Sequence, residues 1–148
     1  MSQTSSPAAT PAADPANRTA LTVAKAVLVA AVGAVLADAL IALVARAAGA
    51  SHAFRPLTPA AYIPLTVIGV LAGAVAWQII RRRAADPSSL LRRLVPIVVA
   101  LSLIPDVAVG LGHSQVGTTW GGVAALMVMH LAVAAIAVPV FRRLLPLR

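Results

Sequence analysis

Four long apolar stretches constrain this chain more than any other feature. They cover roughly residues 22–45, 57–80, 94–111 and 118–141, and each is close to the ~20 residues that a helix needs to cross the hydrocarbon core of a bilayer. Backbone polar groups find no water inside the bilayer, so a chain that crosses it in short apolar segments does so as helices. We therefore predict an all-α fold, a transmembrane four-helix bundle.

The composition excludes several other classes of protein. Hydrophobic residues make up 60% of the 148 residues and charged residues only 11%, which is far more apolar than a soluble domain of this size requires. The absence of cysteine excludes disulfides and thiolate metal sites. We find no glycine-rich phosphate loop, nucleophile elbow or paired-histidine motif, so we expect no enzymatic activity and no cofactor.

The basic residues predict the orientation in the membrane. Ten of the twelve lie before or at the start of the first stretch, between the second and third, or after the fourth, whereas only Arg46 and Arg55 lie on the other side. Basic residues favour the cytoplasmic side, and short connections favour antiparallel neighbours. We predict an up-down bundle with both termini cytoplasmic. The ten residues are Arg18, Lys25, Arg81, Arg82, Arg83, Arg92, Arg93, Arg142, Arg143 and Arg148.

The net charge of +8 does not indicate a nucleic-acid partner. The arginines flank the apolar stretches instead of forming a basic arm interleaved with aromatic residues, so we expect contacts with the lipid bilayer and none with nucleic acid. The five aromatic residues fall at or near the ends of the stretches, where rings commonly lie at the membrane interface. They are Phe54, Tyr62, Trp77, Trp120 and Phe141.

Two regions differ sharply in composition. Residues 1–20 are rich in Ser, Thr, Pro and Ala and have almost nothing to bury, so we predict a disordered cytoplasmic tail. Residues 21–146 then form the transmembrane domain.

Three ionisable residues interrupt the apolar stretches: Asp38, Asp106 and His130. At about 1.5 Å per helical residue all three fall near the middle of the membrane, at depths comparable to those of Thr66 and Ser102. A charged group at that depth costs roughly 3 kcal/mol, so each should face the bundle interior and find a partner. We predict a buried contact between Asp106 and His130 that Asp38 joins from the first span.

This buried polar cluster admits three interpretations. The one we favour is structural, in which the polar groups fix the packing of the helices. The alternative is a subunit of a proton- or cation-coupled carrier or channel, because intramembrane carboxylates and histidines recur in proton relays. A divalent metal held by Asp38, Asp106 and His130 is the weakest, since no close-spaced motif supports it; we predict no metal site.

Small residues and one proline predict how the helices pack. Gly69 and Gly73 are four residues apart, as are Gly33 and Ala37, and such pairs allow close approach of helix backbones. The Gly69 and Gly73 pair could serve packing within the bundle, which we favour, or a homodimer face. Pro105 has no N–H and should break the third helix beside Asp106, which would leave the carbonyl of Leu101 unpaired.

Short segments of the third and fourth spans resemble a known family. Ser102-Leu-Ile-Pro-Asp106, Thr118-Thr-Trp120 and residues 125–132 are similar to the small actinobacterial membrane proteins grouped as domain of unknown function 6069, and the similarity covers roughly residues 20–146. The resemblance implies a multi-pass protein of a bacterial plasma membrane, and it implies no activity, substrate or cofactor. We expect an accessory or assembly protein without enzymatic activity, and leave open a homo-oligomer or another membrane partner.

Overall fold

The structure is a computed structural model that describes residues 15–147, and they form long helices. Four stretches are long and apolar enough to cross a membrane: Asn17–Ala47, Pro59–Arg83, Pro87–Gly112 and Trp120–Leu144. This confirms the predicted all-α fold with four apolar spans. The elements are α1 (Pro15–Ala47), the short 3-10 helix η1 (Arg55–Leu57), α2 (Pro59–Arg83), α3 (Pro87–Ser102), α4 (Ile104–Gly112) and α5 (Trp120–Leu144).

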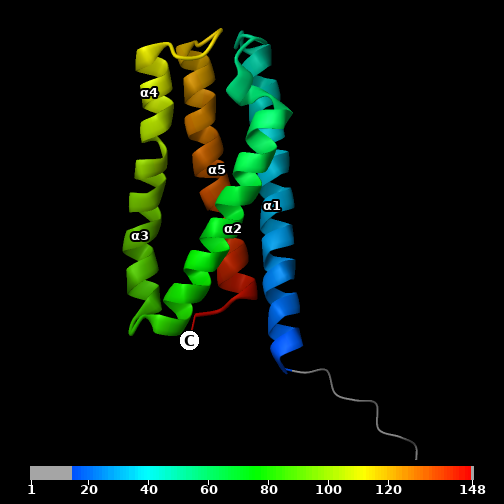
Figure 1. Cartoon of the computed structure of the whole chain (residues 1–148), viewed down its shortest axis with the longest axis vertical. Coiled ribbons are helices and arrows are strands. Elements are labelled where there is room, and N and C mark those ends of the chain that lie inside the picture. Colours follow the sequence, from blue (N-terminus) through cyan, green and yellow to red (C-terminus); the bar gives the residue numbers. More distant parts are fainter. Residues whose placement is uncertain (1–14, 148) are drawn as a thin grey trace, which may run out of the picture.

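The helices run alternately up and down (Figure 1). The start of α1, the α2–α3 connection and the end of the chain lie at one end of the bundle, and the α1–α2 and α4–α5 connections lie at the other. Helix α5 lies against α1, α2 crosses both at an angle, and α3 and α4 continue one another along one side (Figure 1).

The first helix begins earlier than predicted. Helix α1 starts at Pro15, so residues 15–20, which we predicted as part of the tail, are helical. Proline suits the first position of a helix because its fixed φ is helical and its missing N–H would lack a partner there anyway. The prediction for residues 1–14 lies outside the described residues.

The third span also begins early, because Asp86 caps α3. Its Oδ1 accepts hydrogen bonds from the Ser89 backbone N–H (3.0 Å) and the Ser88 hydroxyl (2.8 Å). Pro87 follows at the first helical position, so the cap and the proline together start the helix. The helix therefore starts at 87, before the long apolar stretch that begins near 94.

A break between α3 and α4 positions Asp106. Because Pro105 cannot donate to a carbonyl one turn earlier, the helix is interrupted at Leu103 and resumes immediately. The Leu103 N–H is directed at the carbonyls of Ala100 and Leu101, so the prediction that the Leu101 carbonyl stays unpaired was wrong. The break places Asp106 in the first turn of α4.

A stripe of alanines packs α1 against the rest of the bundle. Lipid tails are as apolar as leucine, so membrane helices associate through close packing of small residues, and these alanines allow it. At Gly33 a Cβ atom would lie 3.1 Å from Ile136 of α5, which shows how closely the two helices approach. The buried alanines of α1 are Ala26, Ala30, Ala34, Ala42 and Ala45.

Four of the five aromatic side chains are buried within the bundle, and only Trp120 is exposed. Trp77 and Phe141 pack with ring centroids 5.8 Å apart, and the Trp77 indole donates to the Leu145 carbonyl at 3.0 Å. Burial within the bundle does not fix the depth of these rings in a membrane, so their location at the membrane interface stays a prediction. Helix faces built of Ala, Gly and Val leave space near the bundle ends, and large rings fill it.

Candidate functional site

The carboxylate of Asp106 lies beside the imidazole of His130 and connects α4 to α5. Asp106 Oδ2 and His130 Nδ1 are 3.0 Å apart. Nδ1 lies equally close, 3.0 Å, to the Leu126 carbonyl in its own helix. By hydrogen-bond geometry Nδ1 pairs with that carbonyl, so Asp106 Oδ2 has an electrostatic contact with the imidazole but no well-aligned hydrogen bond among the described residues. Asp106 is buried, whereas His130 is partly exposed.

The carboxylate of Asp38 makes a separate connection between α1 and α2. Thr66 Oγ1 donates to Asp38 Oδ2 at 2.6 Å. Asp38 is only 1% exposed, and within residues 15–147 its second oxygen, Oδ1, has no hydrogen-bond partner. Asp38 lines the same cavity as His130, but among the described residues the ion-pair partner of His130 is Asp106. The structure therefore brings Asp38 near the other pair, but as a neighbour and not as a third member of one contact.

Ser102 is bonded locally. Its hydroxyl donates to the Val99 carbonyl of its own helix at 2.7 Å. The five polar residues predicted as a cluster thus form two interhelical pairs and one side chain bonded to its own backbone.

All five nevertheless line one cavity of about 590 Å³, here called the central cavity. It lies between α2 on one side and α3 and α4 on the other, with α5 forming part of its wall. The lining extends from Tyr62 and Val109 near one end of the bundle to Trp77 and Leu91 near the other. Most of that lining is apolar, and no described residue in it is lysine or arginine. The polar side chains form a band between apolar walls, here called the polar band, which consists of Asp38, Thr66, Ser102, Asp106 and His130.

The acidic and imidazole groups are not arranged to hold a metal ion. Within residues 15–147, no three His, Asp or Glu side chains form a group that could share one. The hypothesis of a divalent metal held by Asp38, Asp106 and His130 therefore has no geometric support.

Gly69 and Gly73 do not bring two helices together. A Cβ atom at Gly69 would have nothing within 4 Å, and one at Gly73 would be 3.7 Å from Phe141. Both glycines line the central cavity. Gly69 therefore makes no close contact with another helix, whereas Gly73 makes an ordinary contact with Phe141 of α5, and the favoured interpretation, packing within the bundle, stays a prediction. The homodimer alternative is untested.

Among the glycines within helices, the tightest contacts lie elsewhere, at positions that sequence reasoning missed. A Cβ atom at Gly110 would lie 2.9 Å from the Trp120 ring, and one at Gly122 would lie 2.9 Å from the Phe54 ring. The partners are aromatic side chains from distant positions, so no small-residue pattern along one helix could indicate them.

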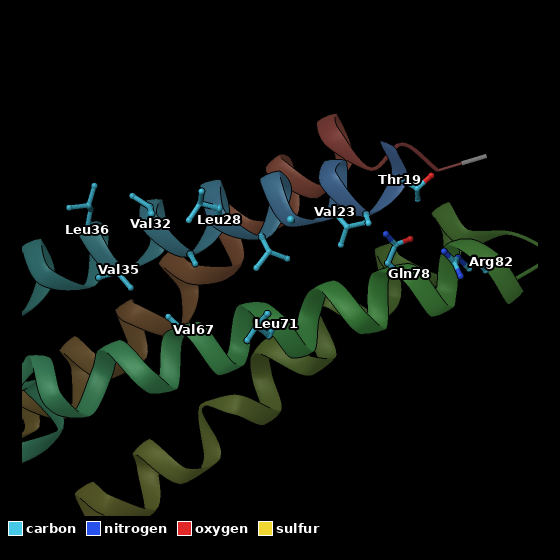
Figure 2. Close-up of a pocket in the computed structure, with 14 residues that line it drawn as sticks. Thr19, Val23, Leu28, Val32, Val35, Leu36, Val67, Leu71, Gln78 and Arg82 are labelled. Carbon is cyan, nitrogen blue, oxygen red and sulfur yellow. The ribbon is translucent and has the colours of Figure 1, made fainter. Parts of the chain in front are cut away.

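A second hollow lies between α1 and α2, and its lining differs from that of the central cavity (Figure 2). This α1–α2 groove has a volume of about 1190 Å³ and is lined mainly by valine, leucine and alanine, with Thr19, Gln78 and Arg82 toward one end. The Gln78 amide atoms are buried without a hydrogen-bond partner among the described residues, a feature that sequence reasoning missed. No carboxylate or histidine lines the groove, so the central cavity is the better candidate for a functional site.

Comparisons with known proteins place the chain in a family. No curated protein and no solved structure matches it. The model of a family of unknown function (DUF6069) matches residues 18–146, which include almost all of the four apolar helices and every residue of the central cavity. This agrees with the resemblance in the third and fourth spans. The chain is a four-span membrane protein and belongs to the DUF6069 family.

Proposed function

We propose that this protein is a non-enzymatic accessory or assembly protein of a bacterial plasma membrane, with both termini cytoplasmic. Its buried polar groups serve to fix the packing of the helices. The observation that carries this proposal is the pair of polar contacts between different helices, Asp38 with Thr66 and Asp106 with His130.

The arrangement of the basic residues supports the orientation. The end of the bundle that holds the α2–α3 connection carries all the described basic residues except Arg46 and Arg55. Arg46 also has a structural role, because its guanidinium donates to the Leu57 carbonyl at 3.0 Å. Such an asymmetry favours the arginine-rich end as the cytoplasmic one.

Cysteine labelling tests the orientation cleanly, because the natural chain contains no cysteine. Ser88 and Ser114 are both exposed and lie at opposite ends of the bundle. In intact cells, a membrane-impermeant maleimide should label Ser114→Cys and leave Ser88→Cys unlabelled until the cells are opened. The reverse pattern would overturn the orientation.

The structural role predicts loss of stability without loss of insertion. Each polar pair joins two helices, and intramembrane hydrogen bonds stabilise by about 0.6 kcal/mol on average and up to about 1.7 kcal/mol. Asp38→Asn and His130→Gln should therefore lower the thermal unfolding temperature of the purified protein in detergent. Wild-type thermal stability in both variants would contradict the structural role.

The second candidate is a subunit of a proton- or cation-coupled carrier or channel. It is supported by the central cavity, which reaches Asp38, Asp106 and His130, and by the unpartnered oxygen of Asp38. Four helices leave little room for a complete pathway, so this function would use an oligomer. Proteoliposomes with a pH-sensitive or Na⁺-sensitive dye test it: Asp38→Asn should abolish flux at normal insertion, and absence of flux in the wild-type protein would refute it.

A further inference from the structure

The central cavity has the size and lining of a small-molecule site. Its volume of about 590 Å³ falls within the roughly 300–1,000 Å³ typical of ligand pockets. Apolar side chains line both ends, from Tyr62 and Val109 to Trp77 and Leu91, and the polar band lies between them. A ligand that fits must therefore have an apolar body and one polar group.

The polar band carries more potential negative than positive charge. Two carboxylates, Asp38 and Asp106, face one imidazole, His130, and no lysine or arginine is among the described lining residues. With both carboxylates ionised, protonation of the imidazole would still leave one negative charge. In a medium that solvates charge poorly, a single positive charge on a ligand would compensate it.

Free acceptors point to a ligand that donates hydrogen bonds. Asp38 Oδ1 is buried and has no hydrogen-bond partner within residues 15–147, whereas Asp106 Oδ2, also buried, has only the 3.0 Å contact with His130 Nδ1. Asp38 is 1% exposed and Asp106 7%. A buried acceptor without a donor is destabilising by about 1–3 kcal/mol, and more when charged. An ammonium group has three N–H donors and could satisfy both oxygens.

We propose that the central cavity binds one amphiphilic organic monocation. Its protonated amine donates to the free Oδ1 of Asp38 and to the carboxylate of Asp106, and its apolar body lies along α2 and α5. The proposal deepens the second candidate function, the cation site, by naming its ligand class. A bare metal ion fits less well because no three described ligand side chains converge. The headgroup of a bilayer phospholipid does not reach mid-membrane depth.

The test compares three probes with the same tail on the full-length protein in phosphatidylcholine nanodiscs. Octylammonium has both charge and N–H donors, octyltrimethylammonium has charge alone, and octanol has neither. Isothermal titration calorimetry, corrected with empty nanodiscs, should show one octylammonium site and affinities at least about tenfold weaker for the other two. Equal binding of octylammonium and octanol would overturn the proposal.

Variants locate the site. Asp38→Asn and Asp106→Asn should each weaken octylammonium binding at least about tenfold. Asp86→Asn, which changes an exposed carboxylate outside the spans, should leave binding unchanged. Unchanged affinity in both cavity variants would overturn the proposal.

A second variant keeps the test decisive if the aspartate variants fold poorly. Gly69→Leu places a side chain on the cavity wall where nothing lies within 4 Å of the new Cβ, so it should block octylammonium with little change in thermal stability. Ala72→Leu, on an exposed face of α2 that lines neither hollow, is the matched control. Wild-type binding in Gly69→Leu would overturn the proposal.

The failure of this proposal can be told apart from the failure of the carrier function. If Na⁺ displaces octylammonium at equal concentration, the ligand is an inorganic cation, and the proposed ligand assignment is overturned. Flux that depends on Asp38 without any octylammonium binding would also overturn the ligand assignment, but it would support the carrier function. Octylammonium binding without flux would support the ligand site and refute the carrier.

Discussion

Thr66 on α2 donates a 2.6 Å hydrogen bond to one oxygen of Asp38 on α1, and it leaves the other oxygen without a partner among the described residues. A buried carboxylate that serves helix packing alone would be expected to have both oxygens satisfied. This half-satisfied carboxylate on the wall of a cavity therefore connects the structural function of the polar groups with a ligand site.

Removing the Thr66 hydroxyl should destabilise the bundle. Thr66→Val keeps the shape of the side chain but deprives Asp38 of its donor, so we expect a loss of about 0.5–2 kcal/mol in the free energy of unfolding. Thr66→Ser retains the donor and should lose less. Reversible unfolding of the purified protein in detergent or bicelles measures both, and wild-type stability of Thr66→Val would show that the hydroxyl does not matter.

The Asp106–His130 contact should appear as coupling in a double-mutant cycle. Asp106→Asn, His130→Gln and the double variant separate the pairwise energy from the effect of each change. We expect a coupling of about 0.5–2 kcal/mol in the same unfolding assay, in line with other intramembrane polar pairs. Additive single effects would mean that the 3.0 Å approach contributes nothing to stability.

Two adjacent glycines at the start of α5 should respond in opposite ways to alanine. A Cβ at Gly122 would lie 2.9 Å from the buried Phe54 ring, whereas one at Gly121 meets nothing within 4 Å. Gly122→Ala should therefore lower stability by about 1–3 kcal/mol through overpacking. Gly121→Ala should leave it unchanged or raise it by up to about 1 kcal/mol through helix propensity. Thermal unfolding compares the two, and identical shifts would contradict the Phe54 contact.

The unpartnered amide of Gln78 should be dispensable for folding. Both amide atoms are buried without a hydrogen bond among the described residues, and the neighbouring wall of the α1–α2 groove is largely apolar (Figure 2). Gln78→Leu removes two unsatisfied polar atoms, so we expect equal or higher stability, by up to about 1 kcal/mol. Gln78→Glu introduces a charge there and should lower it. A strongly destabilised Gln78→Leu would reveal an important role for the amide.

The cap of α3 should weaken at low pH. Hydrogen bonds from the Ser89 N–H and the Ser88 hydroxyl hold the pKa of Asp86 below its usual value. A lowered pKa means that the cap contributes fully above the unfolded pKa, near 4, and is lost as the pH falls through the lower folded value. The Ser89 amide chemical shift should follow this titration by NMR. Asp86→Asn keeps an oxygen acceptor and should remove the pH dependence. A pH dependence that persists in this variant would show that another group causes it.

The sequence determined the fold class and predicted the depth of the polar residues. Segments of about 20 apolar residues can satisfy their backbone in a membrane only as helices, and a constant rise per residue places Asp38, Asp106 and His130 at a common level. It also indicated that Pro105 would interrupt the third span. These properties depend on length and local geometry, which a single segment carries by itself.

Only the tertiary structure decided the partner of Asp38 and where space remains. The predicted contact between Asp106 and His130 is present, but rotation of each helix about its axis pairs Asp38 with Thr66, and no periodicity within one segment specifies that choice. The separation of α3 and α4 from α2 likewise places Gly69 on a cavity wall and not in a helix contact. Packing between segments depends on side chains far apart in the chain, so these features arise only when the bundle is assembled.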